Sequence, residues 1–145
     1  MKAIIVSVTL LFFSGFFSQV FGGPQASQEL QRYLQQKEKE VRIQNAAFKG
    51  FSTQRGKLFY LSKQKHRKSG ELRSCTTCHQ VDPKTAGETH VGKPVEPIAP
   101  VANQTRFKDI EKIEKWFRRN CSWVLERPCT NQEKGDFITY LFSVQ

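Results

Sequence analysis

Methionine and acidic residues are scarce in this chain of 145 residues. The only methionine is Met1, and 13 Asp and Glu stand against 23 Lys and Arg, which gives a formal net charge of +10. The sequence contains no internal repeat, no G-x-G-x-x-G, no P-loop and no G-x-S-x-G. The common motifs of nucleotide-binding proteins and of serine hydrolases are therefore missing. Only four cysteines and three histidines are available as soft or imidazole metal ligands.

Two of the four cysteines belong to Cys75-Thr76-Thr77-Cys78-His79, the C-x-x-C-H signature of c-type haem attachment. One turn of chain between the sulfurs lets both thiols add to the vinyl groups of one porphyrin, and His79 then reaches the iron. A thioredoxin-like redox pair would need a βαβ context, and half of a zinc site would need a second ligand pair; the sequence contains neither. The motif predicts one covalent haem c on Cys75 and Cys78, with His79 as proximal ligand.

The first 22 residues have the layout of a secretory signal peptide. Met1-Lys2 precedes an apolar run from Ala3 to Val20, and small residues surround the expected cleavage site after Gly22. An uncleaved membrane anchor is the alternative, but serines, a threonine and a glycine dilute the run. Cleavage leaves 145 − 22 = 123 residues. We expect a periplasmic protein without a stable membrane anchor, in a compartment where disulfides persist.

The mature chain keeps a large excess of positive charge, +10 − 1 = +9 after loss of Lys2. Much of it lies in a basic loop over residues 62–74, which runs into the haem motif. Such charge favours an acidic redox partner or an anionic membrane surface by raising the association rate, and solvation alone explains it equally well. Nucleic acid is not an expected partner of an exported haem protein.

Four helices are expected. Residues 28–48 predict a surface helix that Gly50 ends, so that residues 23–50 form an amino-terminal helical extension and residues 51–145 a mono-haem domain. Ser52 can cap a second helix, in which Gly56 allows another helix to approach closely.

The remaining two helices follow a long irregular stretch. Prolines between residues 83 and 100 predict chain that is neither helix nor strand and that wraps the haem. A third helix starts at Asp109. The capping box at residues 130–133 opens a fourth helix, whose expected partner is the second.

The distal iron ligand is not fixed by the haem motif. If Met1 leaves with the signal peptide, methionine is excluded, and with it the His/Met pair of ordinary electron-carrying cytochromes c. The remaining candidates are His66, His90, a lysine, Asn120 or no ligand. His66 lies close to the motif and is expected to face solvent, whereas His90 is better placed in the wrapping loop.

The third helix carries one polar residue on its apolar stripe. Asn120 stands seven residues after Ile113 and four after Trp116, and Phe117 belongs to the same stripe. We therefore take Trp116 and Phe117 as candidate haem-pocket residues.

Cys121 and Cys129 remain as an even pair after haem attachment. A disulfide between them would stabilise the fold by roughly 2.5 kcal/mol in the chain-entropy model. It would also hold the chain beside Asn120, although a purely stabilising role is an equal alternative.

Several stretches together point to one protein family. They are Arg55-Gly56-Lys57-Leu58-Phe59, Ser74-Cys75-Thr76-Thr77-Cys78-His79, Gly92-Lys93, Ile98-Ala99-Pro100, Arg106-Phe107, Ile113-Glu114-Lys115-Trp116, Arg119-Asn120-Cys121, Cys129-Thr130 and Glu133-Lys134. With these stretches the chain from Phe51 onward resembles the sphaeroides haem protein family, small exported class I cytochromes c with a high-spin or labile haem. The chain departs from that pattern in a more basic segment before Cys75, in Glu126-Arg127-Pro128 and in a longer amino-terminal helix.

The resemblance implies an all-α class I cytochrome c fold wrapped around one covalently bound haem. It also implies that Asn120 ligates ferric iron and leaves on reduction, that Cys121 and Cys129 form a disulfide, and that a dihaem cytochrome c is the electron donor. A neutral amide oxygen is a hard, weak donor that suits ferric better than ferrous iron. Its departure would open a position for oxygen or nitric oxide beside Ile113, Trp116 and Phe117.

The function expected from this resemblance is electron transfer with binding, or reduction, of one of these gases. Two alternatives stay open. One is a plain six-coordinate electron carrier with His90 as distal ligand. The other is a gas sensor or nitric-oxide scavenger without turnover.

Overall fold

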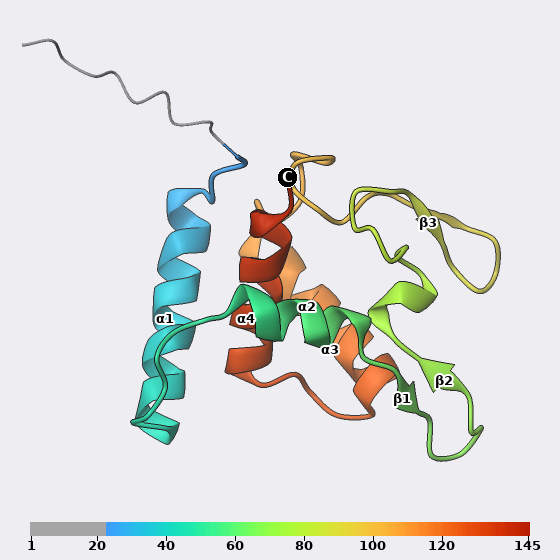
Figure 1. Ribbon diagram of the computed structural model, residues 1–145, viewed down its shortest axis with the longest axis horizontal. Helices are drawn as coiled ribbons and strands as arrows, with labels where there is room; N and C mark the ends of the chain where they lie inside the picture. Colours follow the sequence, from blue (N-terminus) through green and yellow to red (C-terminus); the bar gives the residue numbers. More distant parts are fainter. Residues whose placement is uncertain (1–22) are drawn as a thin grey trace, which may run out of the picture.

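Four helices and two short hairpins make up the fold of residues 23–145, the part of the chain that the computed structural model describes (Figure 1). The predicted signal peptide, residues 1–22, lies outside the described residues. No helix within residues 23–145 is long and apolar enough to span a bilayer. The largest completely buried side chains come from three of the helices: Leu30, Tyr60, Ile138 and Leu141.

Helix α1 (Gln28–Gln44) begins at Ser27, whose hydroxyl accepts a hydrogen bond from the main chain of Leu30 at 3.2 Å. It packs against α4, and Leu30, Tyr33 and Val41 are buried. The other residues of α1 are exposed or partly exposed, so it is a surface helix, as predicted, with one face against the core.

Helix α1 ends earlier than predicted, at Gln44 instead of Phe48. Asn45 adopts extended geometry with φ −145° and ψ 95°, and its side chain accepts a hydrogen bond from the main chain of Ala47 at 3.1 Å. An asparagine side chain that bonds to the following backbone competes with helix continuation. Asn45, and not Gly50, ends the helix.

Helix α2 (Thr53–Leu61) crosses α4 (Asn131–Ser143), as the sequence predicted. Ser52 caps α2 by accepting a hydrogen bond from the main chain of Arg55 at 3.2 Å. The crossing is so close that a Cβ atom at Gly56 would overlap the main-chain carbonyl of Asp136. The capping box of α4 is also present, with Thr130 and Glu133 each bonding to the other's main chain.

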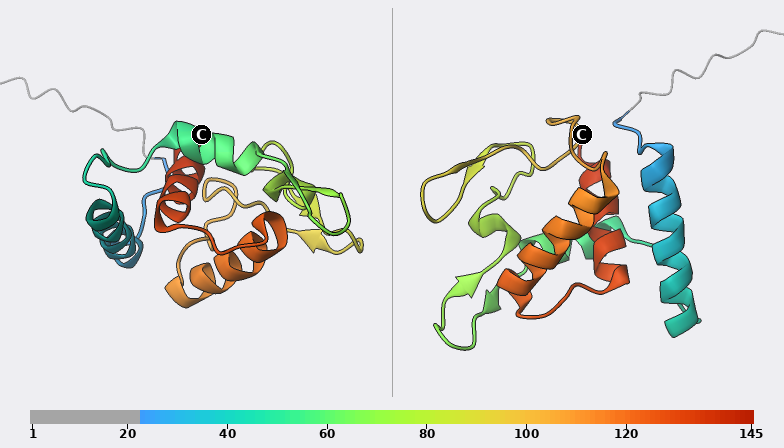
Figure 2. Two further views of the ribbon diagram at one scale, coloured as in Figure 1. Left: turned by 90° about the horizontal axis from the view of Figure 1, so that it is seen from below. Right: turned by 180° about the vertical axis from the view of Figure 1, so that it is seen from behind.

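Helix α3 (Ile110–Leu125) starts at Asp109, whose carboxylate accepts a hydrogen bond from the main chain of Lys112 at 2.9 Å. It ends at Glu126, which adopts a left-handed conformation with φ 53°. Figure 2 shows α3 and α4 between α1 on one side and the hairpins on the other.

The chain between α2 and α3 is largely irregular, as predicted, with two exceptions. The basic loop contains an antiparallel pair, β1 (Gln64–Lys65) and β2 (Leu72–Arg73), and the proline-spaced segment contains β3 (Gly87–Glu88) and β4 (Pro94–Val95). Each strand has two residues, too short for any periodicity to appear in the sequence. The short 3₁₀ helix η1 (Cys75–Thr77) lies between the two hairpins.

Candidate functional site

A cavity of about 590 Å³ lies between the C-x-x-C-H motif and helix α3. One part of its wall contains Cys75, Cys78 and His79, and another contains Asn120. The remaining lining residues are mainly apolar and aromatic, and most of the charged ones are basic. The cavity therefore brings together residues that stand more than forty positions apart in the sequence.

The haem motif forms one tight turn. The main-chain N–H of Ser74 donates to the Thr77 hydroxyl at 3.0 Å, and that of His79 donates to the Cys75 carbonyl at 3.0 Å. Behind the turn, the main chain of Glu88 donates to the Cys78 carbonyl at 3.1 Å. These bonds hold both thiols and the imidazole toward the same cavity.

Burial determines the protonation of these groups. It raises the pKa of the Cys75 thiol to about 12. It also lowers the pKa of His79 to about 4, an effect to which the positive charge of Arg106 adds. His79 is thus a neutral imidazole at neutral pH, the form that binds a metal.

Helix α3 supplies a second wall. Ile113 and Phe117 are buried and Trp116, 42% exposed, lies at the rim, and all three line the cavity. Asn120 lines it as well, and its side chain makes no hydrogen bond within residues 23–145. Its main chain is restrained, because the next residue, Cys121, forms a disulfide with Cys129 across a Cα–Cα distance of 5.5 Å.

The two other histidines lie outside the cavity wall. His90 is exposed in the loop between β3 and β4, although its neighbour Thr89 lines the cavity. His66 was expected to face solvent, but its side chain is half-buried, with 19% of it exposed. Its imidazole contacts the Ser69 hydroxyl at 2.9 Å and the Glu126 carboxylate at 3.4 Å.

Arg106 is a cavity residue to which sequence reasoning gave no role. Its guanidinium donates to the main-chain carbonyls of Glu96 and Pro97 at 2.8 and 2.9 Å, and burial lowers its pKa. The only sequence signal was its place in the family stretch Arg106-Phe107. Lys93, Lys108 and Lys112 line the same cavity.

The residues present fit a covalently attached haem. Two thiols and a neutral imidazole share one turn, the cavity is mostly apolar, and Arg106 with the three lysines can receive the two haem carboxylates. Within residues 23–145, no three His, Cys, Asp or Glu side chains come together to hold a bare metal ion. The described residues therefore provide no second pair of ligands for a zinc site at Cys75 and Cys78.

Comparison with known proteins identifies the family. A family model described as a domain of unknown function, DUF1924, matches residues 46–141. The cytochrome c-type protein SHP of Cereibacter sphaeroides is 44% identical over 88 residues, which cover 61% of this chain and 67% of that protein. The chain belongs to the sphaeroides haem protein family.

Cytochrome c'' of Methylophilus methylotrophus is another relative of this chain. It is 37% identical over 100 residues, which cover 68% of this chain and 69% of that protein. Its oxidised crystal structure superposes with a TM-score of 0.73 at 32% identity, covering 80% of this chain and 94% of that one. A solution structure of the same protein, concerned with haem-ligand detachment, gives a TM-score of 0.70 at 32% identity over 79% and 93% of the two chains.

The structure of oxidised SHP, described as an oxygen-binding cytochrome c, superposes with a TM-score of 0.66 at 34% identity. It covers 81% of this chain and 96% of that one. The all-α class I cytochrome c fold predicted from the sequence is confirmed. As a member of the sphaeroides haem protein family, the chain is a c-type cytochrome with one covalently bound haem c.

Proposed function

We propose that this protein is an exported cytochrome c that accepts electrons and, after Asn120 leaves the haem on reduction, binds oxygen or nitric oxide. The observation that carries the proposal is that Asn120 and His79 line the same cavity from different segments of the chain. No methionine stands in residues 23–145 to take the place of Asn120.

Four residues would hold the cofactor. Cys75 and Cys78 bind it covalently, His79 ligates the iron, and Arg106 can pair with a haem carboxylate. When bound, the haem supplies one-electron redox chemistry and a coordination position for a small ligand.

Asn120 is suited to reversible ligation. Its main chain is held by helix α3 and by the neighbouring disulfide, while no hydrogen bond within residues 23–145 restrains its amide. The side chain can therefore turn about its own single bonds without moving the helix. Its amide oxygen suits ferric iron, and after release its NH₂ group can donate a hydrogen bond to a gas molecule in the cavity.

The relatives support this proposal by analogy. One is described as oxygen-binding and the other by detachment of a haem ligand. The plain carrier with His90 as distal ligand has less support, because His90 does not line the cavity, whereas Asn120 does. A gas sensor or scavenger without turnover would use the same site.

Export and the electron donor belong to the same proposal. Residues 1–22 would direct the chain to the periplasm, where a dihaem cytochrome c would reduce it.

Absorption spectra of the haem-loaded protein test the distal ligand. The ferrous wild type should take up carbon monoxide. Asn120→Ala should change the ferric spectrum, because its alanine side chain cannot ligate iron, whereas His90→Ala should leave the spectrum unchanged. A ferrous wild type that stays low-spin and six-coordinate without binding carbon monoxide contradicts gas binding. A ferric spectrum altered only by His90→Ala supports the plain carrier.

A further inference from the structure

The hairpin formed by β1 and β2, together with its turn, carries positive charge that no carboxylate balances. In this basic hairpin, residues 62–73, Lys63, Lys65 and Lys68 are exposed and form no ion pair within residues 23–145. Residues 1–22 contain no Asp or Glu that could serve them. These lysines are therefore available to an external anionic group.

The nearby carboxylates are already engaged. Glu71 pairs with Arg73 at 2.9 Å, and Glu126 contacts both Arg67 and His66 at 3.4 Å. The free positive charge on the hairpin thus belongs to the three lysines.

An exposed apolar side chain lies beside one of these lysines. Leu72 is 59% exposed and stands directly across the strand pair from Lys65. Opposed residues on neighbouring strands have adjacent side chains. Protein–protein interfaces commonly have an apolar centre surrounded by charged residues. The charges guide the encounter, and the apolar contact forms afterwards.

The hairpin leads directly to the haem. Leu72 precedes Cys75 by three residues, which can span at most about 11 Å of extended chain. Cys75 would hold the porphyrin covalently, so that an electron could enter the haem close to the hairpin.

The hairpin is also fixed to the haem cavity. The Arg73 guanidinium lies 4.7 Å from the ring centroid of Trp123, a residue that lines the cavity, and donates to its carbonyl at 3.3 Å. The main chain of Arg67 donates to the Glu126 carboxylate at 2.9 Å. These contacts join the turn and the second strand of the hairpin to the carboxyl-terminal end of α3, so that the surface is preorganised.

We propose that the basic hairpin is the docking surface for an acidic electron-transfer protein that reduces the haem. The inference rests on the proposed electron-transfer function and adds the partner's chemistry and its place of contact. In the step it serves, the partner's cofactor loses one electron and ferric haem gains it, and no bond is formed or broken. An anionic membrane could bind the same lysines but would bring no electron, so we favour a protein.

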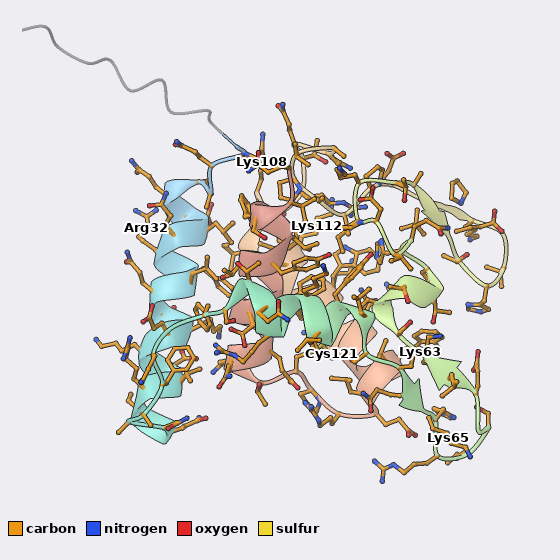
Figure 3. All side chains as sticks on the ribbon, viewed as in Figure 1. Arg32, Lys63, Lys65, Lys108, Lys112 and Cys121 are labelled. Atoms are coloured by element: carbon orange, nitrogen blue, oxygen red, sulfur yellow. A yellow bond between two sulfur atoms is a disulfide. The ribbon has the colours of Figure 1, made fainter. Side chains whose placement is uncertain are left out.

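A matched pair of charge reversals tests the surface. Lys63→Glu/Lys65→Glu alters the hairpin, and Arg32→Glu/Lys39→Glu makes the same change in net charge on α1. Figure 3 shows Lys63 and Lys65 at one end of the molecule and Arg32 on α1 at the other. Arg32 and Lys39 are exposed and form no ion pair within the described part of the chain.

The measurement is stopped-flow reduction of the ferric, haem-loaded mature protein by a reduced plant-type ferredoxin, a strongly acidic donor. At low salt the hairpin pair should slow the second-order rate by about 10- to 100-fold and flatten its salt dependence. The α1 pair should slow it by less than about threefold, since its charges lie far from the contact. Photoreduced lumiflavin, which is uncharged, should reduce all variants at the wild-type rate.

Three results would overturn the inference. Equal slowing by both pairs would mean that net charge alone matters, and no slowing by either would mean that the hairpin is not used. Loss of binding to phosphatidylserine vesicles in the hairpin pair, with an unchanged ferredoxin rate, would assign the surface to membranes. If lumiflavin cannot reduce even the wild type, the electron-transfer function itself fails, which is a separate outcome.

Discussion

Glu114 connects three helices through one carboxylate. It lies on α3, accepts a hydrogen bond from the Tyr33 hydroxyl of α1 at 2.8 Å, and pairs with Lys134 of α4 at 2.6 Å. Lys37 of α1 lies 3.6 Å away. Burial by itself would raise the pKa of Glu114, but the bonds from Lys134 and Tyr33 outweigh it and hold the pKa below 4.5.

A carboxylate with a lowered pKa makes stability depend on pH. Its contribution is complete above the ordinary value of 4.5 and is lost as the pH falls through the lowered pKa of the folded state. Glu114→Gln should reduce the free energy of unfolding by about 1 kcal/mol at neutral pH, since the group is partly exposed. Below pH 4.5 its difference from wild type should shrink.

Urea unfolding at several pH values measures this difference. Glu88→Gln, at an exposed position without an ion pair in residues 23–145, is the control and should follow the wild type. A Glu114→Gln deficit that stays constant down to acid pH would contradict the proposed ionic contribution.

At the same scale, sequence reasoning succeeded where a residue's chemistry is local and failed where it depends on distant contacts. The polar position of Asn120 in an apolar stripe is visible from helical periodicity alone. The partial burial of His66 is not visible in this way, because it depends on Glu126, sixty residues further along. Arg106 likewise becomes a haem-cavity residue only through the folding of the long segment that precedes α3.

The pairing of α2 with α4 is the central contact between elements. Gly56 has no side chain, and a Cβ atom there would overlap the carbonyl of Asp136 in the facing helix. Asp136, 3% exposed, in turn accepts hydrogen bonds from Arg55 and from the main chain of Ser52. The close packing at Gly56 and the hydrogen bonds of Asp136 therefore stabilise the same helix crossing.

Gly56→Ala should separate these helices. We expect a loss of about 3 kcal/mol in unfolding free energy, because the new methyl group meets main chain that cannot turn aside. Lys57→Ala, at the exposed next position, should change stability by less than about 0.5 kcal/mol. Chemical denaturation followed by circular dichroism compares the two. Equal stability of Gly56→Ala and Lys57→Ala would show that the helices can shift apart without cost.

Helix starts were predicted better than helix ends or short strands. Asp109 and the Thr130–Glu133 box are local signals whose bonds close within one turn. The end of α1 at Asn45 and the two-residue strands depend on competing backbone bonds and on long-range folding, which the sequence pattern does not encode.

At the scale of the whole molecule, α1 lies on one side of α4 and the hairpins on the other side of the helical core (Figure 1). The family model starts at residue 46, yet Leu30 of α1 is completely buried in the common core. The division into an extension, residues 23–50, and a haem domain, residues 51–145, stays a prediction about sequence organisation. The packing shows that the two segments share apolar contacts.

Truncating Leu30 measures how strongly α1 supports the molecule. Leu30→Ala should lower the unfolding free energy by about 2–4 kcal/mol, because it leaves a cavity between α1 and α4. Ile43→Ala, at a position 81% exposed on the same helix, should cost less than about 0.5 kcal/mol. Thermal unfolding of both variants, with haem bound, makes the comparison. A Leu30→Ala variant as stable as Ile43→Ala would mean that α1 adds little to the folded core.

The sequence by itself determined the cofactor, its attachment to Cys75 and Cys78, and the absence of a methionine ligand after residue 22, because these depend only on residue type and short spacing. The tertiary structure decided which distal candidate lines the cavity, since Asn120 and His90 both stand far from His79 along the chain and only folding distinguishes them. It also decided that the basic segment before Cys75 is a hairpin anchored to α3. Contacts between residues tens of positions apart fix these features, and no local pattern carries them.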